Sequence, residues 1–542
     1  MPPVDLMSLL LPALLVTTGG LAALGTEPFI ANTDKHRWLP WIAALSLFAA
    51  LVAQIGLLHA GAYGQLDHIF AIDPARAWLC AAVIGSTLIA LAGLQQSLAR
   101  DHYTGGEPYA LMLFSAVGAL LMVMANDTLA LFVGLEIASI SVYALVGLRR
   151  DRKESNEALF KYFVMGAVFS AVFLYGAALT YGATGSTHFG TPVLAGRDSL
   201  MHLGQLLIIV GLLFKVGAVP FHFWSPDAYT GAPAAITGYM GAVIKIGGFT
   251  ALGAVWLNLI NVIGGDAQAG TVLALDASIQ IKPLALGGWM HQFTLIFIFV
   301  GILSVLLGNF SALKQTSARR LIAFSSVAHA GYMLLAFALP GEGDAYQLGG
   351  LWFYLVGYGL STAGTMSAIA AMAGPQDAND SLTGLAGQGR ASPLNGLVLT
   401  VFIASFAGIP PTAGFLGKFL IFGDLVGKGY VAVAIAAMIL AVVGAAYYLR
   451  LLIWVWAVPA KEPARTGPTA MGAWALSAAA IAVVVLVGFP GGVYHPMRGA
   501  VADAPAPAST PMVSILNPVV PVATAAPMVT PAAVATPAPS AP

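Results

Sequence analysis

The segment that decides the fold is residues 201–230, which read MHLGQLLIIVGLLFKVGAVPFHFWSPDAYT. Its apolar stretch is long enough to cross a bilayer, since a helix needs about 20 residues to span ~30 Å of hydrocarbon. Lys215 lies within this stretch, and Pro220 and Pro226 interrupt it. Proline removes a backbone donor, and in lipid such a break is tolerated only where protein or a water-filled cavity satisfies the freed carbonyl groups. The segment therefore predicts a broken membrane helix inside a protein bundle.

The rest of the 542-residue chain has the same apolar character. Charged residues make up 8 % of it, against about 25 % in soluble domains, which is too few to solvate a soluble protein of this length. Apolar residues reach 58 %, which excludes a disordered chain. Basic and acidic residues number 23 each, so no net charge attracts nucleic acid. The single cysteine, Cys80, excludes a disulfide framework and any cysteine-ligated cluster or structural zinc site within this chain.

Long continuous apolar runs predict an all-α polytopic membrane protein, because the strands of a membrane barrel would be alternating segments of about ten residues. We expect about fourteen transmembrane helices. The first lacks a basic leader and is followed by many others, so it is expected to be a retained helix. The expected spans are residues 6–25, 37–59, 74–96, 107–124, 127–148, 158–182, 201–230, 233–258, 290–308, 317–339, 346–373, 394–427, 430–456 and 469–489.

The positions of Lys and Arg predict the orientation, because basic residues gather in cytoplasmic loops. Fourteen basic residues fall in or beside the loops after odd-numbered spans: Lys35, Arg37, Arg100, Arg149, Arg150, Arg152, Lys153, Lys314, Arg319, Arg320, Arg390, Arg450, Lys461 and Arg465. The opposite side has five: Arg76, Arg197, Lys282, Lys428 and Arg498. Both termini are therefore expected outside the cytoplasm.

The ionisable residues inside spans are the candidate functional residues, because a charge at mid-bilayer costs at least ~2.5–3.5 kcal/mol. Glu136, Lys215, Lys245 and Lys418 fall near the middle of spans five, seven, eight and twelve. Three further candidates have competing structural explanations. Lys161, about one turn inside the sixth span, can snorkel toward the preceding basic loop. His222 also fits a cap on the broken backbone, and His329, central in the tenth span, also fits a hydrogen bond between packed helices.

A second broken helix predicts an internal repeat. The twelfth span is interrupted at Pro410 and Pro411, five spans after the first break, and each break has a lysine nearby. Paired interrupted helices are typical of transporters built from repeats. Five is an odd number, so we expect two inverted five-helix repeats, helices 4–8 and 9–13. The expected division is N-terminal helices 1–3 in residues 1–106, the repeats in 107–258 and 259–456, helix 14 in 457–498, and an Ala/Pro-rich disordered tail in 499–542.

These residues suggest a proton relay. A Lys⁺–Glu⁻ pair at ~4 Å is worth about 4 kcal/mol at an effective dielectric near 20, so separating Glu136 from Lys215 can change whether the lysine keeps its proton. The proton would then pass along water to Lys245, to Lys418 and out. Lysine suits this task because arginine would hold its proton. A purely structural buried pair remains the alternative.

Four short motifs carry a family resemblance. They are FKVGAVPFHFWSPDAYTGAP at 214–233, GLE at 134–136, KYF at 161–163 and YMGAVIK at 239–245. Together they resemble the antiporter-like membrane subunits of respiratory complex I, and the DAYTGAP continuation resembles the N-type among them. The resemblance implies a fourteen-helix bundle with two inverted repeats and a polar axis at mid-membrane. By motif, it assigns proton transfer to Glu136, Lys215, Lys245, Lys418 and Lys161.

The resemblance also implies the setting in which the chain works. It predicts a proton-translocating membrane-arm subunit of NADH:quinone oxidoreductase in the bacterial inner membrane, with both termini periplasmic. This chain has no nucleotide-binding loop and no cysteine cluster, so the energy must come from partner subunits, in which the resemblance implies FMN, iron–sulfur clusters and quinone. Those partners are the M-type and small membrane subunits and the peripheral arm. The alternatives are a subunit of a multisubunit cation/proton antiporter without redox coupling and, with less support, a membrane scaffold that has lost pumping.

Overall fold

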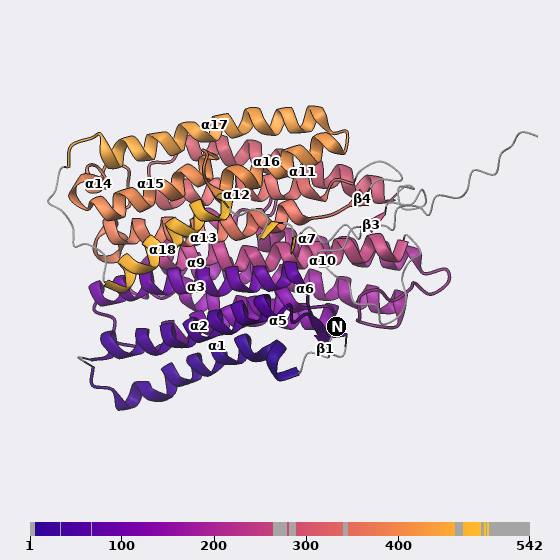
Figure 1. The fold of residues 1–542 in the computed structure, drawn as a ribbon, viewed down its shortest axis with the longest axis horizontal. Coiled ribbons are helices and arrows are strands. Elements are labelled where there is room, and N and C mark those ends of the chain that lie inside the picture. Colours follow the sequence, from indigo (N-terminus) through magenta and orange to yellow (C-terminus); the bar gives the residue numbers. More distant parts are fainter. Residues whose placement is uncertain are drawn as a thin grey trace, which may run out of the picture. The chain divides into compact units, whose positions relative to one another are not determined.

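The computed structural model describes residues 6–32, 34–66, 68–263, 279–280, 289–339, 345–460, 470–488, 493–494 and 496–497. The expected tail at 499–542 lies outside these residues, as do Lys282, Lys461, Arg465 and Arg498. The described chain is almost entirely helical, and its long helices lie side by side and roughly parallel (Figure 1). The predicted all-α fold is therefore confirmed.

The helices correspond to the expected spans. Twelve helical segments of the described residues are long and apolar enough to cross a membrane, and the remaining two expected spans correspond to shorter apolar helices, α15 and α18. The α-helices are α1 (Leu6–Thr26), α2 (Lys35–Ala60), α3 (Pro74–Arg100), α4 (Glu107–Met124), α5 (Thr128–Val146), α6 (Lys153–Thr184), α7 (Asp198–Val216), α8 (Trp224–Gly231), α9 (Ala234–Tyr239), α10 (Lys245–Ile263), α11 (Trp289–Leu313), α12 (Ala318–Leu334), α13 (Gly349–Ala373), α14 (Gln388–Ala391), α15 (Pro393–Ala407), α16 (Ala413–Gly427), α17 (Val431–Trp456) and α18 (Ala470–Gly488).

Short elements join and interrupt these helices. Two small antiparallel pairs lie in loops: β1 (Gly64–Leu66) with β2 (Phe70–Ile72), and β3 (Ile279–Gln280) with β4 (Ala345–Tyr346). Single helical turns are η1 (Glu27–Phe29), η2 (Met240–Ile244), η4 (Leu335–Phe337) and η5 (Pro375–Asp377). The turn η2 is π-helical and lies between α9 and α10. The eighth expected span is thus an α-helix interrupted by a π turn, which the sequence did not predict.

The first predicted break is present between α7 and α8. Gly217, with φ of 70°, ends α7 in the left-handed conformation that glycine adopts without a steric penalty. The Val219 N–H donates to Ser304 Oγ of α11 at 2.9 Å, and the Trp224 indole N–H donates to the Phe214 carbonyl at 3.0 Å. Protein groups therefore satisfy the backbone that the break exposes.

The second predicted break, between α15 and α16, has the same construction. Gly408, with φ of 80°, ends α15. The Gly414 N–H donates to Ser405 Oγ at 3.2 Å, and Lys418 Nζ donates to the Phe406 carbonyl at 2.6 Å. Lys418 is thus both a candidate functional residue and the donor that satisfies a carbonyl group freed by the second break.

Loops after odd-numbered spans contact one another, as the predicted topology requires. Arg149, after the fifth span, pairs with Asp101 after the third at 2.9 Å and with Asp377 after the eleventh at 2.8 Å. Loops after even-numbered spans meet in the same way, since the side-chain amide of Asn126, after the fourth span, donates to the His68 carbonyl, after the second, at 3.2 Å. The loops therefore gather in two groups at opposite ends of the spans.

Small residues allow α4 and α5 to approach closely. A Cβ atom added at Gly118 would lie 2.3 Å from the Ala138 backbone nitrogen and 2.6 Å from the Gly134 carbonyl oxygen. Neither backbone atom can move without shifting its helix. Such small-residue contacts are typical of packing between membrane helices.

We expect Gly118→Ala to lower the free energy of unfolding by at least about 1–3 kcal/mol, because overpacking forces the two helices apart. Cys80, buried in α3, provides the measurement: the temperature at which a thiol reagent labels it in the purified chain should fall. Gly56→Ala is the control, because nothing lies within 4 Å of the added atom. Equal effects of the two substitutions would contradict this account of the α4–α5 contact.

Candidate functional site

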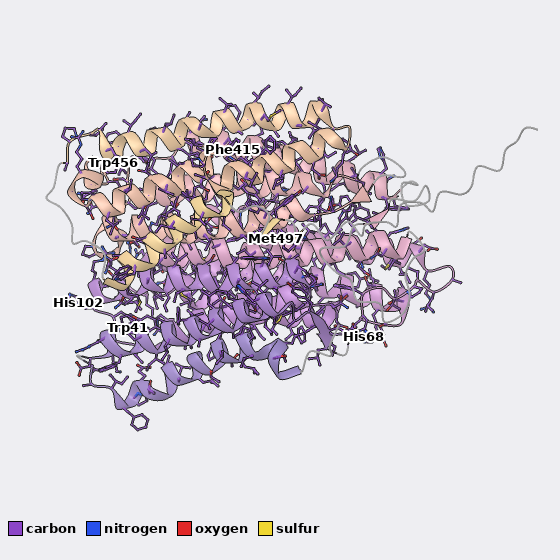
Figure 2. All side chains as sticks on the ribbon, in the orientation of Figure 1. Trp41, His68, His102, Phe415, Trp456 and Met497 are labelled. Carbon is purple, nitrogen blue, oxygen red and sulfur yellow. The ribbon has the colours of Figure 1, made fainter. Side chains whose placement is uncertain are left out.

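Four of the predicted site residues lie in the interior of the bundle. Side chains fill the space between the helices (Figure 2), and the exposed fractions are 2 % for Lys215 and Lys245, 7 % for Lys418 and 1 % for His329. They come from α7, α10, α16 and α12, respectively. None of them faces lipid, so each needs a polar partner from the protein or from water.

Glu136 and Lys215 lie close together but have separate hydrogen-bond partners. Glu136 of α5 is half-buried and accepts a hydrogen bond from Ser170 of α6. The Lys215 ammonium donates to Ser139 of α5, one helical turn after Glu136, and lies 5.9 Å from the centre of the Tyr143 ring. In the described residues no direct ion pair joins the two charges. Each member of the expected pair is therefore bonded to a serine hydroxyl group and not to the other member.

Lys245 lies at the point where the π turn ends. Residues 240–244 form η2, and Lys245 begins α10. Its ammonium donates to the Ser326 carbonyl of α12 at 2.5 Å. The Ser326 hydroxyl is bonded in turn to Tyr358 at 2.9 Å and to Tyr229 at 3.3 Å. π turns are frequent at functional sites because they displace one side chain from the regular helical position.

His329 lies between the lysines of the two halves. Its ring centre lies 5.1 Å from that of Tyr358, whose ring is 6.0 Å from the Lys245 ammonium, and 5.9 Å from that of Tyr332, whose ring is 5.2 Å from the Lys418 ammonium. One ring nitrogen is hydrogen-bonded to Tyr354 at 2.5 Å and the other to Tyr448 at 2.8 Å. Each hydroxyl group can both donate and accept, so either tautomer of the ring is accommodated. The proposed helix-packing role and a relay role are both compatible with this position.

Lys418 is held at the second break. In addition to its bond with the Phe406 carbonyl, its ammonium lies 5.2 Å from the centre of the Tyr332 ring. The Tyr332 hydroxyl is 3.3 Å from the Asn309 amide nitrogen, and Asn309 also accepts from Tyr447 at 3.0 Å. Polar contacts therefore continue from Lys418 toward α11 and α17.

Lys161 and His222 lie apart from this interior group. Lys161 of α6 has a side chain that is 42 % exposed and pairs with Glu157 at 2.6 Å and Asp227 at 2.9 Å. His222 lies in the first break and is partly exposed, and its Nδ1 atom has no hydrogen-bond partner within the described chain. The structure therefore brings Glu136, Lys215, Lys245, Lys418 and His329 into one region and leaves these two residues outside it.

The hydroxyl groups of this region were not among the predicted site residues. The Ser139 and Ser170 hydroxyl groups bind Lys215 and Glu136, the Ser326 hydroxyl lies beside the carbonyl that binds Lys245, and three tyrosines lie next to His329 and Lys418. Buried hydroxyl groups in apolar helices are a weak sequence signal, because Ser commonly bonds to the carbonyl of its own helix. Tyrosine in an apolar run likewise indicates packing as often as chemistry. Only the placement of these groups opposite the charges distinguishes them.

The described residues contain no group of three or more His, Cys, Asp or Glu side chains that could hold a metal ion. What the region offers is a set of adjacent groups that can take up and release protons. Lysine, histidine, serine and tyrosine side chains occur in this region from α5 to α17, and each hydroxyl group can both donate and accept a hydrogen bond. Such an arrangement suits proton transfer.

Comparisons with known proteins identify the family of the chain. The family model described as NADH:quinone oxidoreductase/Mrp antiporter, TM, matches residues 125–275 and 267–444. The NADH-quinone oxidoreductase subunit N of Trichlorobacter lovleyi is 33 % identical over 462 residues, which cover 84 % of this chain and 88 % of that protein.

Two solved structures are similar to the fold. A chain of respiratory complex I from Thermus thermophilus is 31 % identical, with a TM-score of 0.72 over 89 % of this chain and 98 % of that one. A chain of the Mrp complex from Dietzia sp. is 19 % identical, with a TM-score of 0.75 over 91 % and 97 % of the two chains, and shows the fold alone. The chain belongs to the NADH:quinone oxidoreductase/Mrp antiporter family of membrane proteins, among the NADH-quinone oxidoreductase subunit N relatives.

Proposed function

We propose that this chain is a proton-translocating membrane-arm subunit of NADH:quinone oxidoreductase, and that it moves protons along the interior Glu/Lys axis. The observation that carries the proposal is the burial of three lysines and a histidine on four different helices, each bonded to a hydroxyl or carbonyl group of the protein. Protein interiors avoid such charges unless they serve a function. The subunit N relatives supply the assembly in which the axis works.

The path begins at Glu136 and Lys215 and continues through Lys245. A change in the separation of Glu136 from Lys215 alters the free energy of the lysine charge by up to about 4 kcal/mol at an effective dielectric near 20. The proton then passes to Lys245, and from there through His329 and its tyrosines to Lys418. Lys161 and His222 contribute from outside this line, Lys161 by pairing with Asp227 beside the first break.

The energy for this transfer comes from redox chemistry in partner subunits. The chain acts as part of a translocase without its own redox centre, and FMN, iron–sulfur clusters and quinone belong to the partners. Those partners are the M-type and small membrane subunits and the peripheral arm. The cation/proton antiporter alternative has less support, since the Mrp chain is 19 % identical whereas the complex I chain is 31 % identical.

We further propose the domain division and orientation that the sequence predicts. Residues 107–258 and 259–456 form the two inverted repeats, flanked by helices 1–3 in 1–106 and helix 14 in 457–498. The loops after odd-numbered spans face the cytoplasm and both termini lie in the periplasm of the bacterial inner membrane. The gathering of these loops at one end supports this arrangement.

Cysteine labelling tests the orientation. In spheroplasts, a membrane-impermeant maleimide should label Arg197→Cys at once and Lys314→Cys only after the membrane is permeabilised, because the two exposed residues lie on opposite sides. The unsubstituted chain is the control, since its only cysteine is buried. Immediate labelling of Lys314→Cys would reverse the proposed orientation.

Substitution of Lys245 tests the proton path. In the assembled complex reconstituted in vesicles, Lys245→Ala should lower NADH-driven proton transport at least about tenfold, because a positioned proton carrier contributes 10²-fold or more. Lys245→Arg should fail as well, since arginine keeps the charge but holds its proton.

The exposed Lys314 supplies the matched control for this measurement, and Lys314→Ala should pump normally. Full activity of Lys245→Arg would mean that only the positive charge is needed. Full activity of Lys245→Ala would exclude Lys245 from the path.

A further inference from the structure

A buried acid lies outside the proposed proton path, in the loop that follows α13. Asp377 in η5 is 1 % exposed. Its φ is 53°, and that of the preceding Gln376 is 51°. This left-handed conformation is uncommon for residues other than glycine, and it persists where the surrounding structure holds it, often at functional sites. The burial and the left-handed backbone of Asp377 therefore need a physical explanation.

One oxygen of Asp377 joins three segments that are far apart in the sequence. Asp377 Oδ2 accepts from the Arg149 guanidinium at 2.8 Å and from the Ala234 backbone N–H at 2.9 Å, and lies 3.8 Å from Arg319 NH1. Arg149 follows α5, Arg319 is in the first turn of α12, and Ala234 is the first residue of α9. Contacts of one carboxylate thus link the two halves of the chain.

The charge on this carboxylate is stable. Burial alone raises the pKa of Asp377, but the Arg149 and Arg319 guanidinium groups and the hydrogen bond from Ala234 outweigh burial and hold the pKa below its ordinary value. Asp377 is therefore ionised at neutral pH. Its bonds to Arg149 and to the N–H group are charge-assisted, which makes them roughly twice as strong as neutral hydrogen bonds.

The same cluster holds the residue before Pro233 as well. Arg319 NH1 donates to the Ala232 carbonyl at 2.8 Å, while its Nε donates to Asp380 at 2.8 Å. Arg149 is held by Asp101, which also accepts from the Gln376 N–H at 2.7 Å. The start of α9 is therefore fixed on both sides, its N–H by Asp377 and the preceding carbonyl by Arg319.

The segment held in this way leads directly to Lys245. From Ala234 the chain runs through α9 and the π turn η2 to the lysine, eleven residues on and about 16 Å away at 1.5 Å per residue. The helix is buried along its length. A closely packed helix transmits a displacement of its end, because packed interiors deform little. Movement at Asp377 would therefore change where Lys245 lies.

A polar cavity adjoins the cluster on the loop side. It has a volume of about 320 Å³, and its lining includes Asp101, Arg149, Gln376 and Pro233. Asp377 Oδ1 is buried and has no hydrogen-bond partner among the described residues. The carboxylate therefore keeps one oxygen without a partner in the described chain, and its neighbours Arg149 and Gln376 line the cavity.

We propose that Asp377 is a positioning residue, a latch that fixes the start of the α9–η2–α10 helix against the loops of both halves and thereby sets the position of Lys245. The latch acts through the helix and does not itself carry the transferred proton. This inference rests on the proposed function, because the position of Lys245 matters for transport only if Lys245 is in the path.

The test compares Asp377→Asn with Asp380→Asn in the assembled complex. Asp380 is the matched control, since it shares Arg319 and lies three residues away, but its carboxylate bonds to Ser317 and Arg319 and not to the start of α9. In Asp377→Asn, amide hydrogen exchange of residues 231–245 should become about tenfold faster or more, because a hydrogen bond to a charged acceptor is lost. Protons moved per NADH should fall, whereas Asp380→Asn should change both quantities less, because it leaves the Ala234 N–H bonded to Asp377.

Unchanged exchange in residues 231–245 of Asp377→Asn would overturn the latch, and so would equal acceleration in both variants. The latch is also overturned if Asp377→Asn speeds exchange but leaves proton transport unchanged while Lys245→Ala blocks transport. If Lys245→Ala transports normally, the proposed function has failed while faster exchange still supports the mechanical link. Should Asp377→Asn not assemble, Asp377→Glu keeps the charge and displaces the oxygens, and the same exchange criterion applies to it.

Discussion

The free-energy cost of burying charge in a membrane protein governs the rest of this structure. Lys215, Lys245 and Lys418 are each almost fully buried, and each is bonded to an oxygen from another part of the bundle. An unpaired charge at this depth costs at least ~2.5–3.5 kcal/mol. The helices are therefore arranged so that hydroxyl and carbonyl oxygens face the lysines and no carboxylate of the described residues is in direct contact with them.

The cost of burying charge also explains the breaks and the π turn in these helices. The break between α15 and α16 exposes the Phe406 carbonyl, which accepts from Lys418. The π turn before Lys245 alters the register at the point where the ammonium meets the Ser326 carbonyl. The first break lies directly after Lys215. Each buried lysine thus coincides with an irregularity in its helix, and the loop cluster around Asp377 fixes the start of one of these helices.

The sequence predicted the parts of this structure that depend on hydrophobicity and backbone chemistry. Apolar runs identified the spans, prolines identified both breaks, and charges inside spans identified the lysines. It could not predict the partners, because Ser139, Ser326 and Tyr448 are brought opposite the charges only by tertiary packing. Nor could it show that Lys161 points outward to Asp227, or that Asp377, in a polar loop, would be buried between two arginines.

The central claim is that these buried groups form one continuous path for protons, with water bridging the intervals that side chains leave. The most direct measurement is a density map of the chain within its native assembly, at a resolution that shows ordered water. The account predicts water molecules that join Lys215 to Lys245 and Lys245 to the His329–Lys418 region. Apolar side chains packed across either interval, with no room for solvent, would contradict it.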